Sequence, residues 1–179
     1  MQSIRKIAVF CGARHGVRPI YTEAAHEFGK LLAEAGCGLV YGAGRVGLMG
    51  VVAQACLDHG GHVTGVIPHF LKSRELLHPD LQSCHTTINL FERKSMMMDI
   101  ADGFVALPGG LGTFDELIEV MAWRQLQQTD KPIALLNVDG YFQPWLAALS
   151  HAAAEGFLDR VSVGRGVDHE PRRLLLESF

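Results

Sequence analysis

Short apolar runs alternate with segments of helical periodicity along the chain. Continuously apolar runs, which are typical of strands buried on both faces of a sheet, cover residues 6–11, 38–41, 62–67, 103–107 and 132–137, with a weaker one at 85–89. Helical patterns cover residues 19–35, 48–59, 90–101, 113–127 and 144–155, with a short one at 170–178. This alternation predicts the α/β class: an open parallel sheet of Rossmann-like type, with helices on both faces, in a single domain over residues 1–179.

Composition narrows the functional classes. The net charge is −3 and no Lys/Arg cluster stands out, so we expect no nucleic-acid surface. No apolar run approaches the roughly 20 residues of a membrane helix, and the polar start runs directly into the first strand, so we expect neither membrane association nor a signal peptide. The isolated cysteines, without a C-x-x-C pair, indicate free thiols in the cytoplasm. His59 and His62 flank a glycine turn, but no carboxylate or thiolate completes a ligand set with them, so we expect no metal.

Three glycine-bearing turns follow predicted strands, at residues 11–14, 41–47 and 107–113. Ligands of open parallel sheets bind outside the carboxyl ends of the strands. The functional site is therefore expected at these turns.

The turn that contains Gly42, Gly44 and Gly47 matches G-x-G-x-x-G between a strand and a helix, which is the pattern of a dinucleotide-binding turn. That pattern also needs a carboxylate at the end of the next strand to hold the ribose, and none follows until Glu75. NAD(P) binding is therefore disfavoured. Close packing of helix on strand and contact with a nucleotide both stay open.

The turn with Gly109, Gly110 and Gly112 carries a stronger signal. It leads into a helix, where free N–H groups and the helix dipole favour an anion, and Thr113 adds a hydroxyl. A phosphate monoester fits such a loop. No Lys-Ser/Thr pair follows the last glycine, so the loop is not a Walker A motif and ATP hydrolysis is not expected.

Glu116 has two interpretations. With Thr113 it forms T-x-x-E, the spacing of a helix capping box. Alternatively it points into the site and activates water or stabilises an oxocarbenium-like sugar. Asp115 diverges from it by about 100° around the helix, so the two cannot form an ordinary glycosidase pair.

The helix at residues 90–101 holds a basic pair and a methionine run. Arg93 and Lys94 either form a solvated helix face, or Arg93 holds phosphate or ribose oxygens through its fork of donors. Residues 96–98 are all methionine, which fills cores in most proteins but can also form a soft wall against a purine.

Together these segments resemble the Lonely Guy (LOG) family, the cytokinin riboside 5′-monophosphate phosphoribohydrolases, often mislabelled lysine decarboxylases. The family motif P-G-G-x-G-T-x-x-E is present at residues 108–116, and E-R-K-x-x-M at 92–97. The turn Y-G-G-G-x-x-G-L-M-G is matched at 41–50, with Ala43 in place of a glycine. In the first turn, Ala13 stands where the family usually has serine. Residues 66–68, 130–132 and 136–141 also resemble family sequence.

The resemblance implies hydrolysis of the N-glycosidic bond of AMP or an N6-modified nucleoside 5′-monophosphate, without a cofactor, by at least a homodimer with its site near the subunit interface. It implies that Arg93 and Glu116 are catalytic. The substrate-binding residues that it implies are Gly42, Gly44, Gly47, Met49, Lys94, Met97, Gly109, Gly110, Gly112 and Thr113.

Two rival functions use the same fold. A non-catalytic nucleotide or molybdenum-cofactor carrier has similar glycine turns and would retain its ligand without turnover. An NAD(P) oxidoreductase lacks its ribose carboxylate here. Lysine decarboxylation needs a pyridoxal-phosphate lysine, and only Lys94 lies near the candidate site.

Overall fold

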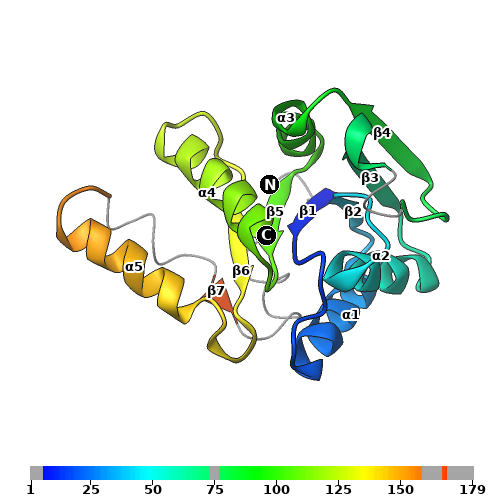
Figure 1. Cartoon of the computed structure of the whole chain (residues 1–179), viewed down its shortest axis with the longest axis horizontal. Helices are drawn as coiled ribbons and strands as arrows, with labels where there is room; N and C mark the ends of the chain where they lie inside the picture. The colour runs from blue at the N-terminus through cyan, green and yellow to red at the C-terminus, as the bar shows by residue number, and fades with distance from the viewer. Residues whose placement is uncertain (1–5, 73–76, 159–166, 169–179) are drawn as a thin grey trace.

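Seven strands form one sheet in the computed structural model, which describes residues 6–72, 77–158 and 167–168 (Figure 1). The strands are β1 Lys6–Phe10, β2 Gly38–Tyr41, β3 Val63–Pro68, β4 Ser83–Thr87, β5 Gly103–Ala106, β6 Ile133–Leu136 and β7 Val167–Asp168. The helices are α1 Pro19–Glu34, α2 Gly47–Asp58, α3 Leu90–Ile100, α4 Leu111–Gln125 and α5 Gln143–Ala154, with 3₁₀ turns η1 His69–Leu71 and η2 Val138–Gly140.

The strand order is β4-β3-β2-β1-β5-β6-β7, and all the pairings are parallel. β1 lies between β2 and β5, so that Ala8 is paired with Val40 on one side and Phe104 on the other. From β1 the chain adds β2, β3 and β4 on one side of the sheet. It then returns to the other side of β1, where it adds β5, β6 and β7. This reversal is the topological switch point, where open α/β sheets bind ligands.

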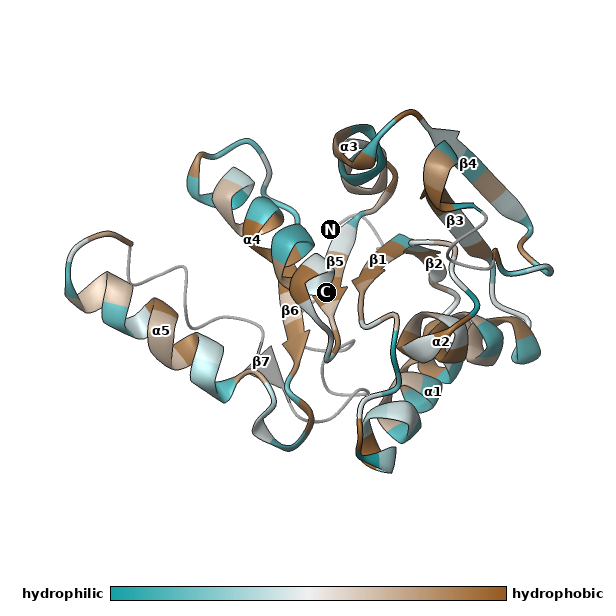
Figure 2. Cartoon of the chain, viewed as in Figure 1, coloured by the Kyte–Doolittle hydropathy of each residue, from teal (hydrophilic) through white to brown (hydrophobic). Residues whose placement is uncertain are grey.

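Two apolar layers cover the two faces of the sheet. Ile7 and Val9 face a core with α1 and α2, whereas Ala8 and Phe10 face a second core with α3 and α4. Because successive strand residues point to opposite faces, a strand covered on both sides must be apolar throughout. Figure 2 shows this in the brown colouring of β1 and β6 between the helices.

The predicted class, the parallel sheet and its covering helices are confirmed. β4 begins at Ser83 and ends at Thr87, earlier than the predicted residues 85–89, because this edge strand is largely exposed and carries no apolar run to mark it. β7 was not predicted. The helix predicted at residues 170–178 lies outside the described residues.

Candidate active site

The three glycine turns meet at the switch point, as expected. The N–H of Gly12 donates to the carbonyl of Pro108 at 3.1 Å, and the N–H of Met49 donates to the carbonyl of Gly12 at 3.3 Å. Gly47 has φ +68, and a Cβ there would lie 2.2 Å from the carbonyl carbon of Ala13. The turn after β2 therefore needs its glycine to pack against the turn after β1, which is a packing role between two turns rather than between helix and strand.

A cavity of about 290 Å³ opens between these turns, α3 and α4. It brings together most of the residues predicted for the site. Those that line it are Gly42, Met49, Arg93, Lys94, Gly110, Gly112, Thr113 and Glu116. Leu71, at the end of η1, and Leu90, at the start of α3, also line the cavity. Neither was predicted for the site, because a lone apolar residue at such a position carries no signal in the sequence.

The start of α3 fixes the place of Arg93. Asn89 caps the helix by accepting from the N–H of Glu92 at 2.9 Å, and the Glu92 carboxylate accepts from the N–H of Ile88 at 2.6 Å. The capping residue and the glutamate three positions later thus satisfy backbone donors at the helix entry. Arg93 follows directly and is only 7% exposed, so the interpretation of this residue as part of a solvated helix face is wrong.

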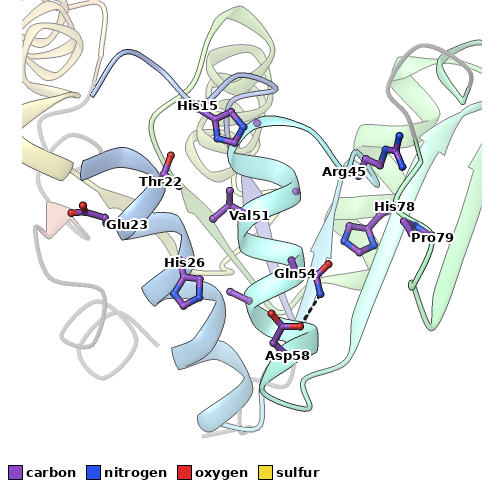
Figure 3. Close-up of a pocket in the computed structure, with 13 residues that line it drawn as sticks. His15, Thr22, Glu23, His26, Arg45, Val51, Gln54, Asp58, His78 and Pro79 are labelled. Carbon is purple, nitrogen blue, oxygen red and sulfur yellow. Dashed lines mark hydrogen bonds between the residues drawn. The ribbon is translucent and has the colours of Figure 1, made fainter. Parts of the chain in front are cut away.

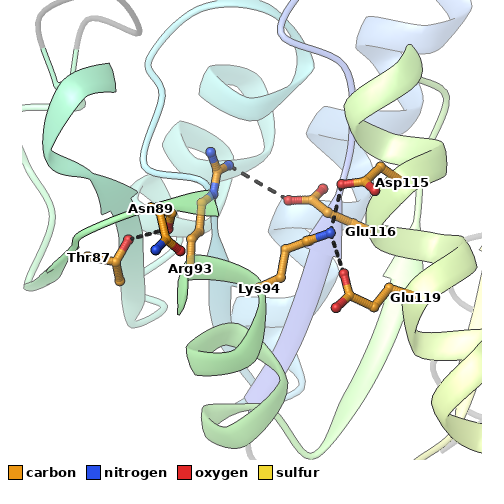
Figure 4. Close-up of polar contacts among 7 residues, drawn as sticks. All are labelled: Thr87, Asn89, Arg93, Lys94, Asp115, Glu116 and Glu119. Carbon is orange, nitrogen blue, oxygen red and sulfur yellow. Dashed lines mark hydrogen bonds and ion pairs between the residues drawn. The ribbon is translucent and has the colours of Figure 1, made fainter. Parts of the chain in front are cut away.

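Glu116 faces Arg93 across the cavity (Figure 4). Its Oε1 lies 3.8 Å from Nη2 of Arg93, and both side chains are largely buried. The capping-box interpretation of Glu116 is wrong, because α4 begins at Leu111 and its N-cap is Gly110, with no side-chain cap. Thr113 is therefore already inside the helix, and one turn of α4 carries Glu116 toward the cavity.

Gly42 makes room for the guanidinium. A Cβ at this position would lie 2.0 Å from Nη2 of Arg93 and 3.1 Å from the sulfur of Met49. The absence of a side chain at Gly42 is therefore what allows Arg93 to occupy its observed position beside the turn after β2.

Lys94 forms a second polar contact between α3 and α4. Its Nζ lies 3.0 Å from Asp115 Oδ2 and also contacts Glu119 Oε2 (Figure 4). Burial disfavours the ammonium, but hydrogen bonds to Glu119 and Asp115 outweigh it, so the pKa of Lys94 lies above its ordinary value. The solvated-face interpretation is wrong for Lys94 as well, and its contacts tie the two helices together.

The glycines of the loop before α4 differ in role. A Cβ at Gly109 would lie 2.0 Å from the Thr113 hydroxyl oxygen and 2.7 Å from the nitrogen of Gly12, so this glycine is required by packing. Gly110 and Gly112 line the cavity, and a Cβ on either would meet no atom within 4 Å. The amides of the first turn of α4 have no partner within the helix, so this end of the cavity suits an anion.

Four residues predicted to bind substrate do not line this cavity. Gly109 packs against Thr113 and Gly12, and Gly44 is buried in an isolated bridge to Leu77. Gly47 lies against the turn after β1. Met97 is 1% exposed in the core beneath α3, so the core interpretation applies to it, because its position on the helix turns it toward the sheet.

Cys11 lines the cavity directly after β1. Burial and the nearby negative charge of Glu116 raise the pKa of the Cys11 thiol. The thiol therefore stays protonated at neutral pH and contributes a small apolar wall rather than a nucleophile.

A second cleft, of about 830 Å³, lies between α1 and α2 (Figure 3). Its walls are mixed: His15, Glu23 and His26 are among the residues that line it, and Gln54 donates to Asp58 at 2.7 Å. Apart from Gly47, no predicted site residue lines it.

Within residues 6–72 and 77–158, no three His, Cys, Asp or Glu side chains are grouped to hold a metal. In the same part of the chain, no helix is long and apolar enough to span a bilayer.

The sheet order, the cavity at its switch point and the glycine turns define a Rossmann-like α/β protein with its site at the carboxyl ends of the central strands. The family described as "Possible lysine decarboxylase" matches residues 49–170. A probable cytokinin riboside 5′-monophosphate phosphoribohydrolase of Oryza sativa subsp. japonica is 48% identical over 154 residues, which are 86% of this chain and 63% of the relative. A cytokinin riboside 5′-monophosphate phosphoribohydrolase of Arabidopsis thaliana is 45% identical over 154 residues, which are 86% of this chain and 72% of the relative.

The chain belongs to this family, the LOG family of phosphoribohydrolases. The chain spans less than two thirds of the length of the rice relative. Among solved structures, a molybdenum cofactor binding protein from Rippkaea orientalis aligns with TM-score 0.68 at 21% identity, over 96% of this chain and 93% of that one. This likeness supports the fold.

Proposed function

We propose that the protein hydrolyses the N-glycosidic bond of AMP or of an N6-modified nucleoside 5′-monophosphate, releasing the free base and ribose 5-phosphate. The observation that carries this proposal is the buried pair of Arg93 and Glu116, 3.8 Å apart in a cavity that ends at the N-terminus of α4. The activity named for the relatives, cytokinin riboside 5′-monophosphate phosphoribohydrolase, supports the substrate class.

The roles follow from the position of each group. The amides of Gly110, Gly112 and Thr113 hold the 5′-phosphate at the positive end of the helix dipole. Arg93 orients ribose or phosphate oxygens with its fork of donors and offsets their negative charge. Glu116 directs water to C1′ and takes its proton, while the electron pair of the C1′–N bond leaves with the base, which takes up a proton from solvent. A carboxylate there also stabilises positive charge on the sugar.

A lysine decarboxylase, as the family description suggests, does not fit Lys94. A lysine that forms a Schiff base must readily lose its proton, which requires a lowered pKa. The contacts of Lys94 with Asp115 and Glu119 act in the opposite direction.

We also propose that the protein works as a homodimer in the cytoplasm. Exposed apolar side chains, among them Leu90, Phe91, Leu111 and Ile118, lie on α3 and α4, the helices that border the cavity. Such a surface suits a second copy of the chain. The free cysteines of the described residues suit a reducing compartment. Sedimentation analysis of the wild type and of Phe91→Glu tests the dimer: the variant should be monomeric, and a monomeric wild type would contradict the proposal.

The test of the reaction is a chromatographic product assay with AMP and N6-isopentenyl-AMP. The wild type should release the base and ribose 5-phosphate from at least one of them. Glu116→Gln should lower kcat by at least about 100-fold, since it keeps the shape but loses the base. Glu27→Gln, an exposed position on α1, makes the same chemical change outside the cavity and should act as the wild type.

Two results would overturn the proposal. Release of neither base by folded wild-type protein would reject the reaction, and retention of unchanged nucleotide through gel filtration would then favour a carrier. Parental rates in Glu116→Gln would reject the assigned role of the carboxylate.

A further inference from the structure

Tyr141 reaches the glycine loop from outside the cavity. Its hydroxyl donates to the carbonyl of Gly109 at 2.5 Å, across 32 positions of sequence. Tyr141 directly follows η2 and ends the segment at residues 136–141, for which the proposed reaction provides no role. The contact links the connection between β6 and α5 to the loop before α4.

The ring of Tyr141 and the chain segment that carries it are both held in place. Asp139 in η2, with φ +47, forms an ion pair with Arg18 at 2.5 Å. The Tyr141 ring meets the Tyr21 ring edge to face, with centroids 5.7 Å apart. The N–H of Tyr141 donates to the carbonyl of Val138 at 3.0 Å. These contacts with η2, with α1 and with the residue before α1 fix the direction from which the hydroxyl approaches the loop.

The consequence concerns one peptide plane. The carbonyl of Gly109 and the N–H of Gly110 belong to the same trans peptide, so they point in opposite directions. Tyr141 holds the carbonyl and is not part of the cavity wall, whereas Gly110 lines the cavity. Because glycines on both sides leave this plane free to rotate, a contact at the carbonyl decides where the N–H points.

We propose that Tyr141 is a positioning residue that aims the Gly110 amide at the phosphate of the substrate. The inference rests on the proposed function, since it assumes that the loop binds the 5′-phosphate. Tyr141 touches no part of the substrate and acts through the backbone alone. It therefore affects recognition of the phosphate and leaves the handling of the base and the sugar unchanged.

The experiment compares Tyr141→Phe with Tyr21→Phe, which removes a hydroxyl from the neighbouring ring. For each protein we would measure kcat and KM for AMP, and inhibition constants for ribose 5-phosphate and for adenosine. In Tyr141→Phe, KM for AMP and the inhibition constant of ribose 5-phosphate should both rise about fivefold to tenfold. The adenosine constant, kcat and the melting temperature should stay near their wild-type values. Tyr21→Phe should change none of them.

Each outcome is decisive. Unchanged ribose 5-phosphate binding in Tyr141→Phe overturns the inference, and so does equal weakening of both inhibitors, which would mean general loosening of the fold. The proposed function fails in a different way, when the wild type itself neither releases base from AMP nor binds ribose 5-phosphate.

Discussion

Gly42→Ala is expected to disable the site by displacing Arg93 while leaving the fold intact. A Cβ at position 42 would lie 2.0 Å from Nη2 of Arg93, whereas nonbonded heavy atoms stay about 3.5 Å apart. The guanidinium must therefore retreat by about 1.5 Å. It is the far end of a flexible side chain, so it can move where backbone could not.

The expected loss of activity follows from that displacement. A misplacement of about 1 Å in an active site can cost about 100-fold in rate, which corresponds to about 2.7 kcal/mol of transition-state stabilisation. We therefore expect kcat/KM for AMP to fall by about 100-fold. The free energy of unfolding should change by less than about 1 kcal/mol, because Gly42 lies outside the left-handed region and alanine restricts the unfolded chain.

A double-mutant cycle with Arg93→Ala tests the cause of this loss. If Gly42→Ala acts through the guanidinium, it should lower kcat/KM by less than about twofold when Arg93 is already absent. Base release is followed by chromatography and stability by urea unfolding. Losses that simply add in the double mutant would refute the reasoning, as would a single mutant with wild-type kcat/KM.

Other predictions concern the supports of the site and the loop after β3. Lys94→Met should lower the free energy of unfolding by about 2 kcal/mol at pH 7, because Asp115 and Glu119 lose their partner. Because the pKa of Lys94 is raised, the difference in free energy of unfolding between wild type and Lys94→Met should persist below pH 10.5 and vanish as pH rises through the raised pKa. A difference in unfolding free energy that is independent of pH would contradict this. Burial lowers the pKa of His78 from 6.5, so the unfolded chain takes up that proton first and stability should fall below about pH 6.5. Below pH 6.5 the melting temperature of His78→Gln should fall less steeply with pH than that of the wild type. An equally steep fall would exclude His78 as the cause. Asn89→Ala should cost about 1 kcal/mol in urea unfolding and Asn89→Asp much less, because aspartate keeps the cap; equal losses would contradict the capping role.

The order of strands and helices follows from the sequence because local physics determines it. A strand covered on both faces must be apolar throughout, and the runs at β1, β2, β3, β5 and β6 satisfy this condition. The exposed edge strand β4 does not satisfy it, and its limits were misplaced for that reason. The positions of the three glycine turns follow from the same strand ends.

The local sequence left the role of Glu116 open, because T-x-x-E spacing is compatible with a helix cap as well as with a catalytic carboxylate. The helix start at Gly110 decides against the cap. That start depends on how the loop packs against Gly12, which is about a hundred positions away in the chain. The basic pair on α3 was ambiguous for a similar reason, since burial of Arg93 and Lys94 depends on α4 lying opposite.

By itself, the sequence determined the class of fold, the turns that carry the site and the motifs shared with the family. Only the tertiary structure decided that Arg93 and Glu116 face each other, that Gly42 clears space for the guanidinium and that Met97 belongs to the core. The physical reason is that periodicity along one segment reports which face of that segment is buried. Which groups meet across the cavity depends on the position of each helix against a sheet that joins β1 to β5.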